Sequence, residues 1–169
     1  MRYTLEREAG RPLFSCHPVR MTHAPPLPAD DTTAALHELA LRWRDELRGR
    51  AEVSLPHEDG GAEGFSVTSR ADGAAEVRVM HDAEGIVVGI DRCPGWELPR
   101  TASSVATIDA VVAAAVAGTI EVGSGRGIRR YRVTTGGGDV LEDTFEGFLA
   151  LALSMPWRRR LRWETTTPY

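Results

Sequence analysis

Two short runs of the sequence place histidine next to carboxylates, the side chains that metal binding and general acid–base catalysis use most often. The first run is His57, Glu58 and Asp59, and the second is His81 and Asp82. Adjacent side chains at the end of a strand diverge, and no second group of ligands follows at a metal-binding spacing. We therefore interpret both runs as solvated acidic turns, and we predict no metal and no cofactor.

The sequence also offers three nucleophile candidates, none of which has an activating context. Cys16 stands beside a histidine in a proline-rich segment, and Cys93 precedes a proline. Ser124 lies in the glycine-rich run at residues 123–127, but the residues that follow predict a strand, whereas a phosphate-binding loop or a nucleophile elbow leads into a helix. We predict a protein that is not an enzyme. The alternative is an enzyme or small-ligand site assembled from scattered residues such as His81, Asp82, Arg126 and Arg130.

The most distinctive run is the Trp/Arg segment at residues 156–163, with the sequence PWRRRLRW. In an extended conformation its apolar and cationic side chains separate onto opposite faces. The apolar face holds Trp157, Leu161 and Trp163, and the cationic face holds Arg158, Arg160 and Arg162. Tryptophan and arginine dominate the energetics of protein interfaces and also stack on nucleic-acid bases. A third interpretation is a final strand whose tryptophan face closes the core.

Residues 52–97 have the opposite charge balance, because acidic residues outnumber Arg70, Arg78 and Arg92 there. Many of the acidic residues fall at predicted turns and so gather at the ends of strands. Such a patch steers a basic partner, although an ordinary solubilising surface gives the same pattern. The candidate partner-binding residues are Trp157, Arg158, Arg160, Arg162, Trp163, Glu58, Asp59 and Glu84.

The elements that must position these residues follow from periodicity. A helix is predicted from the caps Asp30 and Asp31 to Gly49, with an apolar stripe at helical spacing made of Leu36, Leu39, Ala40, Trp43 and Leu47. Residues 1–29 are predicted to be an N-terminal extension or an edge strand with a proline-rich linker, and residues 30–169 a single domain.

Beyond this helix the pattern changes to short alternating runs, which predict a four-stranded antiparallel meander over residues 53–88. An Ala/Val-rich helix is predicted from Ser103 or Ser104 to Gly118, followed by strands at residues 120–122, 128–135 and 140–144 and a short helix at residues 145–155. Hairpin turns without βα alternation predict an α+β fold, an antiparallel meander sheet with both long helices packed on one face.

Composition restricts the function classes. The chain has 169 residues, 42% of them hydrophobic, and a formal net charge of −4, which fits one globular domain without a global nucleic-acid footprint. Every cationic side chain is arginine, which indicates a GC-rich bacterial gene. The charged N-terminus does not resemble a signal peptide, and no apolar run is long enough to span a bilayer. We therefore expect a cytoplasmic protein that does not engage a membrane.

The order of elements is similar to that of small secretion-chaperone-like folds and of small bacterial immunity proteins. This resemblance implies a protein partner. We predict a non-catalytic protein-binding domain, a bacterial immunity-like inhibitor or a dedicated chaperone whose partner is a basic toxin or a secreted effector. The third hypothesis is nucleic-acid binding through the Trp/Arg segment, and the negative net charge of the chain disfavours it. A homo-oligomer stays open because a meander has edge strands.

Overall fold

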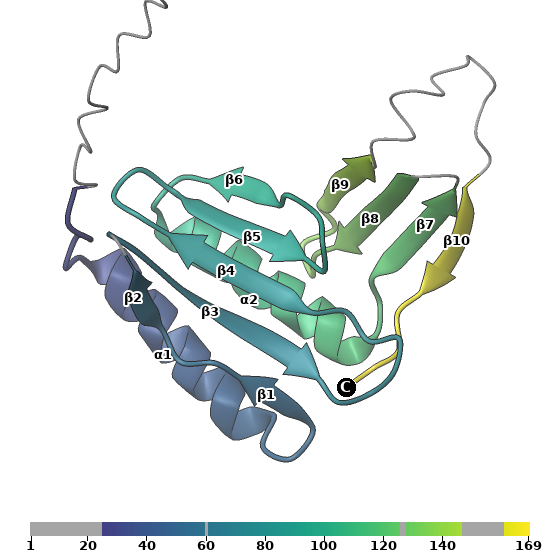
Figure 1. Ribbon diagram of the computed structural model, residues 1–169, viewed down its shortest axis with the longest axis horizontal. Helices are drawn as coiled ribbons and strands as arrows, with labels where there is room; N and C mark the ends of the chain where they lie inside the picture. The colour runs from purple at the N-terminus through teal and green to yellow at the C-terminus, as the bar shows by residue number, and fades with distance from the viewer. Residues whose placement is uncertain (1–24, 60, 126–127, 147–160) are drawn as a thin grey trace, which may run out of the picture.

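The computed structural model describes residues 25–59, 61–125, 128–146 and 161–169, and the side chains of all of these except 57–59 and 146. These residues form two helices and two antiparallel sheets, which confirms the predicted α+β class (Figure 1). In chain order the elements are α1 (Asp31–Glu46), β1 (Ala51–Val53), β2 (His57–Asp59), β3 (Ala62–Ser69), β4 (Val77–His81), β5 (Ile86–Ile90), β6 (Trp96–Leu98), α2 (Ala102–Ala117), β7 (Glu121–Gly125), β8 (Ile128–Thr134), β9 (Val140–Glu146) and β10 (Arg162–Thr165).

Helix α1 begins where the sequence predicted. The Asp30 carboxylate caps it by accepting a hydrogen bond from the Thr33 backbone N–H at 2.9 Å. The predicted stripe faces the interior, with Leu36, Leu39, Ala40 and Trp43 all buried. The helix ends at Glu46, before the predicted Gly49, because the chain turns there and leads into β1.

Sheet A has the strand order β1-β3-β4-β5-β6, with β2 also paired to β3. The predicted hairpins are present, but the predicted first strand is two short strands, β1 and β2, that pair with different parts of β3. Strand β6 was not predicted. Its three residues lie between Pro94 and Pro99, and a run that short carries no periodic signal.

Sheet B has the strand order β10-β7-β8-β9. The sequence did not separate this sheet from the first. Helix α2 explains the division, because its 16 residues carry the chain about 24 Å along sheet A before β7 begins. The last two residues of the Trp/Arg segment, Arg162 and Trp163, begin β10, which pairs with β7 across about 40 residues of sequence and gave no local pairing signal. The predicted helix at residues 145–155 lies mostly outside the described residues, and its first two residues belong to β9.

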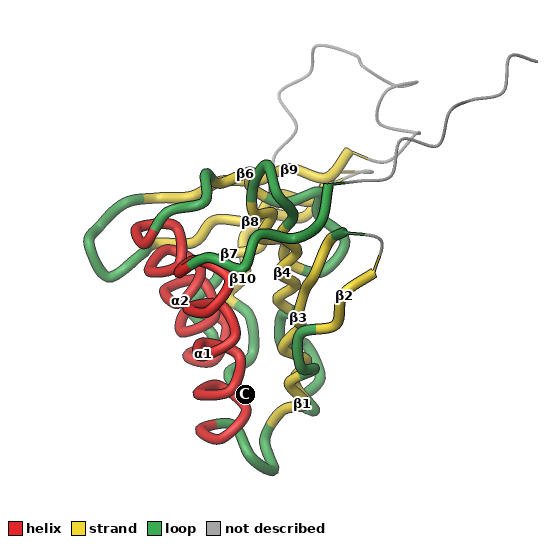
Figure 2. The backbone as a smooth tube through the Cα atoms, turned by 90° about the vertical axis from the view of Figure 1, so that its left-hand side faces the viewer, coloured by secondary structure: helices red, strands yellow, loops and turns green. Residues whose placement is uncertain are grey.

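Both helices cover the same face of sheet A (Figure 2). Helix α2 is capped by the Thr101 hydroxyl, two to three residues before the predicted caps, and ends at Gly118. A φ of +68° at Gly118 is a conformation that favours glycine. One cluster of buried hydrophobic side chains joins the helices to both sheets and includes Leu36, Phe65, Val79, Val88, Ile108, Val112, Tyr131 and Val133.

Polar contacts fix sheet A against sheet B along a seam between the β5–β6 connection and sheet B. The Tyr131 hydroxyl donates to Asp91 Oδ2 at 2.7 Å. The Gly95 N–H donates to Asp143 Oδ2 at 2.9 Å, and the Trp96 indole donates to the Glu142 carbonyl at 2.8 Å. Each of these bonds joins a residue of sheet A or its β5–β6 connection to a residue of sheet B, so together they hold the two sheets in one arrangement.

Candidate functional site

No described helix or strand covers the outer face of sheet A, opposite α1 and α2 (Figures 1 and 2). One row of this face is set by the strand register, in which Gly64 pairs with Met80, Met80 with Val87, and Val87 with Glu97. Met80 is 48% exposed and Val87 36% exposed. Apolar side chains at outward positions of neighbouring strands are a feature that a protein–protein contact would explain.

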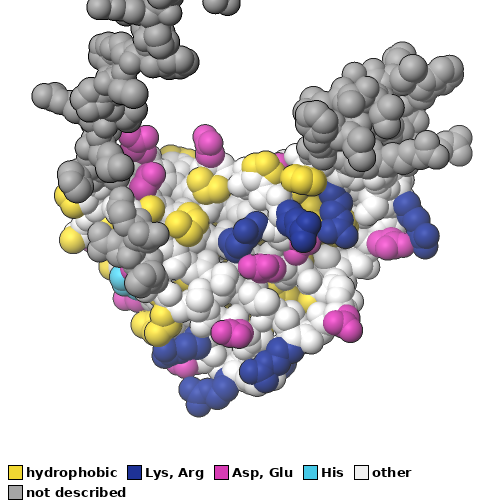
Figure 3. All heavy atoms as spheres, viewed as in Figure 1, with side chains coloured by type: hydrophobic (Ala, Val, Ile, Leu, Met, Phe, Trp, Pro, Cys, Tyr) yellow, Lys and Arg dark blue, Asp and Glu magenta, His cyan; other side chains and the backbone are white. Residues whose placement is uncertain are grey.

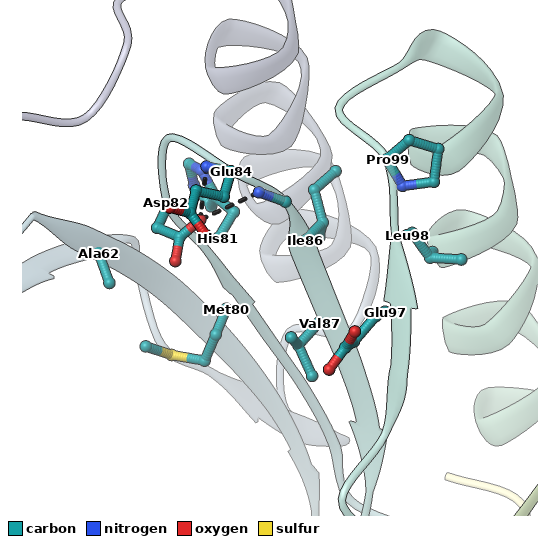
Figure 4. A pocket seen from close by; sticks show the side chains of 11 residues that line it. Ala62, Met80, His81, Asp82, Glu84, Ile86, Val87, Glu97, Leu98 and Pro99 are labelled. Carbon is teal, nitrogen blue, oxygen red and sulfur yellow. Dashed lines mark hydrogen bonds between the residues drawn. The ribbon is translucent and has the colours of Figure 1, made fainter. Parts of the chain in front are cut away.

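Met80, Val87 and Glu97 of this row line a hollow of about 530 Å³, which we call the acidic–apolar hollow. Its apolar walls come from Ala62, Met80, Val87, Leu98 and Pro99, and its acidic rim from Asp82, Glu84 and Glu97. Figure 4 shows Met80, Val87 and Glu97 on the same side of the strands. Glycine is favoured in the row, because a Cβ at residue 64 would collide with the backbone carbonyl oxygen of Val79 as well as with the Met80 side chain. The Met80 side chain therefore extends over Gly64 of β3.

The rim of the hollow carries negative charge that this part of the chain does not neutralise. The Asp82 carboxylate accepts hydrogen bonds from the backbone N–H groups of Glu84 and Gly85, and these bonds lower its pKa. Within the described residues neither Glu84 nor Glu97 forms an ion pair. An acidic rim of this kind attracts cationic side chains of a partner. The flexible Met80 side chain adapts its shape to an apolar side chain of that partner.

On the opposite side of the same strands lies a polar cluster, the helix-side network, made of Asp30, His37, Glu63, His81 and Arg100. Glu63, at the start of β3, is only 7% exposed. Its Oε2 lies 2.8 Å from His37 Nε2 and 3.6 Å from His81 Nε2. A buried carboxylate needs such donors, because desolvation of an unpaired charge is costly.

Arg100, just before α2, forms hydrogen bonds to several members of this network. Its guanidinium donates to Asp30 Oδ1 at 2.7 Å, to the Asp82 carbonyl at 2.7 Å and to His81 Nδ1 at 3.2 Å. The backbone bond from Thr33, followed by the bond from Arg100, lowers the pKa of Asp30 to about 2. Burial, followed by the Arg100 charge, lowers the pKa of His81. The network therefore holds a neutral histidine between the Arg100–Asp30 ion pair and the Glu63 carboxylate.

Two histidines and a glutamate could in principle hold a metal, but this geometry does not suit one. Arg100 donates to His81 Nδ1, so the proton of the neutral ring resides on Nε2, the nitrogen that faces Glu63. A protonated nitrogen cannot bind a metal. Among the residues that the structure describes, no group of three or more His, Cys, Asp or Glu side chains forms a metal site. The helix-side network joins α1, sheet A and the start of α2.

The structure describes the side chains of Glu84, Arg162 and Trp163 among the predicted partner-binding residues, and these three do not lie together. Glu84 lies on the rim of the acidic–apolar hollow. Glu58 and Asp59 belong to β2, next to β3, and their side chains are outside the description. Trp157, Arg158 and Arg160 fall outside the described residues.

Arg162 and Trp163 lie in β10, on the outer part of sheet B, away from the acidic–apolar hollow. One interpretation predicted that the tryptophan face of this segment closes the core. However, Trp163 is 37% exposed and is not part of the core. Instead its ring lies against Gly123 on the neighbouring strand, and the Arg132 guanidinium lies 4.6 Å from the ring centroid. Glycine at the opposite position leaves room for the indole on the surface of the sheet. Arg162 pairs with Glu164 at 2.9 Å.

The structure does not bring together the residues of the alternative scattered site. His81 points to the helix side, and the Asp82 carboxylate closes its own turn. Arg130 belongs to sheet B, where it donates to the Thr144 hydroxyl at 3.2 Å, and Arg126 is outside the described residues.

The described nucleophile candidates are not activated either. Burial, with the neighbouring Asp143, raises the pKa of Cys93 to about 12, so its thiol stays neutral. Ser124 is exposed and forms no hydrogen bond to a histidine among the described residues.

Sequence reasoning missed Met80 and Val87, and it counted Glu97 among the acidic residues of 52–97 without listing it as a partner-binding residue. A signal for the first two was available: Met80 stands at the outward position between Val79 and His81, and Val87 at that between Ile86 and Val88. Side chains along a strand alternate between the two faces of the sheet, so an apolar residue at an outward-facing position indicates an apolar outer face. Which outward residues become neighbours depends on register, which the sequence did not fix.

The chain matches no protein-family model, no curated protein and no solved structure. Neither helix in the described part of the chain has the length and apolar character needed to cross a membrane.

Proposed function

We propose that this protein is a non-catalytic protein-binding domain that holds a basic partner polypeptide against the outer face of sheet A. In this proposal it acts in the bacterial cytoplasm, as an immunity-type inhibitor of a basic toxin or as a dedicated chaperone of a secreted effector. The observation that carries the proposal is the acidic–apolar hollow, where exposed Met80 and Val87 lie beside Glu84 and Glu97, which form no ion pair with any described residue.

The occupant is specified by charge and shape together. The apolar row crosses β3, β4 and β5 in register, so it fits an extended or helical segment with one apolar face. The carboxylates at the rim favour lysine or arginine flanking that face. Figure 3 shows hydrophobic side chains over sheet A with Asp and Glu side chains near them.

The partner is tested by affinity capture from a native bacterial lysate, with the captured chain identified by mass spectrometry. The wild type is compared with Glu84→Arg/Glu97→Arg, which reverses the rim charge. The matched control is Glu38→Arg/Asp139→Arg, which makes the same change in net charge at exposed positions away from the hollow. We expect one basic polypeptide that the wild type and the control retain and that the rim variant loses.

Affinity is then measured with the purified partner over a salt series. The rim variant is expected to bind at least about tenfold more weakly, chiefly through a slower association rate, and the wild-type rate is expected to fall as salt increases. Equal binding by the rim variant and the wild type, or a captured partner that is acidic, contradicts the proposal. Substitution of Met80 by Gln tests the apolar row independently of charge.

A further inference from the structure

A second concave region lies at the seam, between β4 and the end of β5 in sheet A and β7, β8 and β10 in sheet B. It consists of two adjoining hollows of about 630 and 330 Å³. Arg92, Ser124 and Arg129 line both hollows, so the two lie side by side. We call this region the arginine cleft. Figure 3 shows Lys/Arg side chains gathered over the junction of the two sheets on the face viewed.

Three arginines from separate parts of the chain line the cleft. Arg78 comes from β4, Arg92 from the connection after β5, and Arg129 from β8. Arg78 donates to the Asp91 carbonyl, and Arg129 donates to the Tyr131 hydroxyl at 3.4 Å. None of the three forms an ion pair within the described part of the chain.

The carboxylates of the cleft offset part of this positive charge. Asp91 is fixed in place, because its two oxygens accept from the Tyr131 hydroxyl and from the Glu76 N–H, neutral donors that leave its negative charge unchanged. Glu164 pairs with Arg162. Among the described lining residues, Arg78, Arg92 and Arg129 therefore outnumber the remaining carboxylates, Glu76 and Asp91, by one. Elsewhere in sheet B, by contrast, Arg132 binds both Glu121 and Glu142.

The smaller hollow has an apolar lining beside the arginines. Cys93, Ile128, Tyr131 and Phe145 contribute to it, and Phe145 is 38% exposed. Cys93 is neutral, since burial raises its pKa to about 12. Burial also raises the pKa of Tyr131, whose hydroxyl is turned to Asp91. An uncharged aromatic and aliphatic lining favours a flat apolar group.

We propose that the arginine cleft binds a small organic anion that carries a planar apolar group. The planar group enters the smaller hollow beside Phe145 and Tyr131. The anionic group accepts hydrogen bonds from the guanidinium groups of Arg92 and Arg129, whose planar forks match a carboxylate or a phosphate. The volumes fall in the usual range for small-molecule sites, and the proposal does not depend on the protein-binding function.

The test titrates the full chain with naphthalene-2-carboxylate, and separately with adenosine 5′-monophosphate, by isothermal calorimetry. Both probes carry a planar aromatic group, which is joined to a carboxylate in the first and to a phosphate in the second. The probe that binds identifies the anionic group that the cleft recognises. The neutral analogue 2-naphthalenemethanol is expected to bind at least about tenfold more weakly than the carboxylate if charge recognition contributes one ordinary charged hydrogen bond.

The variant Arg92→Gln/Arg129→Gln is expected to lose at least about tenfold in affinity for the binding probe. Arg44→Gln/Arg48→Gln is the matched control, because it makes the same change in net charge at side chains that are 44% and 83% exposed, in and just after α1. Phe145→Ser tests the apolar wall and is expected to weaken the carboxylate and its neutral analogue alike. Circular dichroism and urea unfolding confirm that each variant folds.

The proposal is overturned if neither anionic probe binds at millimolar concentration, or if 2-naphthalenemethanol binds as tightly as the carboxylate. It is also overturned if the folded double arginine variant keeps the wild-type affinity. The rim variant Glu84→Arg/Glu97→Arg is expected to bind the probe normally, which separates this site from the protein-binding surface.

Discussion

The helix-side network and the arginine cleft both gather charged side chains from distant parts of the chain, but they use them differently. In the network Arg100 forms an ion pair with Asp30, and the Glu63 carboxylate lies 2.8 Å from His37 Nε2, so Arg100 and Glu63 each have a polar partner inside the fold. In the cleft Arg92 and Arg129 face a hollow without a carboxylate partner among the described residues. Charges matched within the protein stabilise its architecture, whereas unmatched charges beside a hollow are available to a ligand.

Burial accompanies this difference. The Arg100 side chain is only 10% exposed and those of Glu63 and His81 are 9% and 1% exposed, so removal of any partner leaves a desolvated polar group. Arg92 and Arg129 are exposed, so water solvates them in the free protein. Substitutions in the network are therefore expected to affect stability, and substitutions in the cleft to affect binding.

The largest expected effect is that of Arg100→Ala. The substitution removes the donor to Asp30, His81 and the Asp82 carbonyl at once. Because Asp30 is partly exposed, we expect a loss of about 2–4 kcal/mol in the free energy of unfolding, somewhat less than for a fully buried pair. Urea denaturation measures it.

Arg92→Ala is the control for this comparison and is expected to change the free energy of unfolding by less than about 0.5 kcal/mol. If Arg92→Ala destabilises the protein as much as Arg100→Ala, the distinction between network and cleft is wrong.

Tyr131→Phe is expected to have an intermediate effect. Tyr131 belongs to both descriptions, because its ring lines the cleft and its hydroxyl donates to Asp91 across the seam. Loss of this hydrogen bond to a carboxylate is expected to cost about 1–2 kcal/mol, again by urea denaturation. Because the ring is kept, binding of an apolar anion is expected to change less than in the double arginine variant. An unchanged unfolding midpoint would show that the seam does not depend on this bond.

The smallest effect is a pH dependence that originates at His81. Its ordinary pKa is 6.5, and burial, the charge of Arg100 and His37 lower it, opposed by Glu63 and Asp30. The unfolded chain therefore binds more protons than the folded protein between the lowered pKa and 6.5, so the free energy of unfolding rises with pH in that window. Above pH 6.5 this contribution is constant.

His81→Asn keeps an acceptor for Arg100 and removes the titrating ring. The pH profile of its unfolding free energy is expected to be flatter than that of the wild type just below pH 6.5. The check is a set of urea titrations at several pH values. A variant profile parallel to the wild-type profile would assign the pH dependence to other groups.

The parts of the fold that were predicted from sequence are those with local signals. Helix α1 has its cap at Asp30 and its stripe at helical spacing, and each hairpin has its glycine turn. Strand β6 and the separation of the sheets were missed. The pairing of β10 with β7 and the bond between Tyr131 and Asp91 join residues about 40 positions apart, and no propensity encodes such a pairing.

The candidate sites were less predictable for the same reason. Glu84 was predicted as a partner-binding residue because an acidic turn is a local feature. Glu63 looked like one more surface carboxylate, yet it is buried between two histidines from α1 and β4. Met80 and Val87 become neighbours only through the register of β4 and β5, and the three cleft arginines only through the docking of the two sheets.

Residues 166–169 are anchored to the domain by backbone hydrogen bonds to the carbonyl oxygens of Ile120, Gly73 and Val116, and this anchoring has a consequence for the order of folding. The Tyr169 hydroxyl is shared by the carbonyl oxygens of Val67 and Ala75, the first of which is 102 positions away in sequence. To form such a contact the chain must close a long loop, which costs conformational entropy before the contact contributes any stability. Chains rich in contacts between distant residues fold slowly. We expect the hairpins of sheet A to form early and the docking of Tyr169 to come last. The β3–β4 turn, where it docks, is then the part of the domain exposed longest to chaperones and proteases during folding.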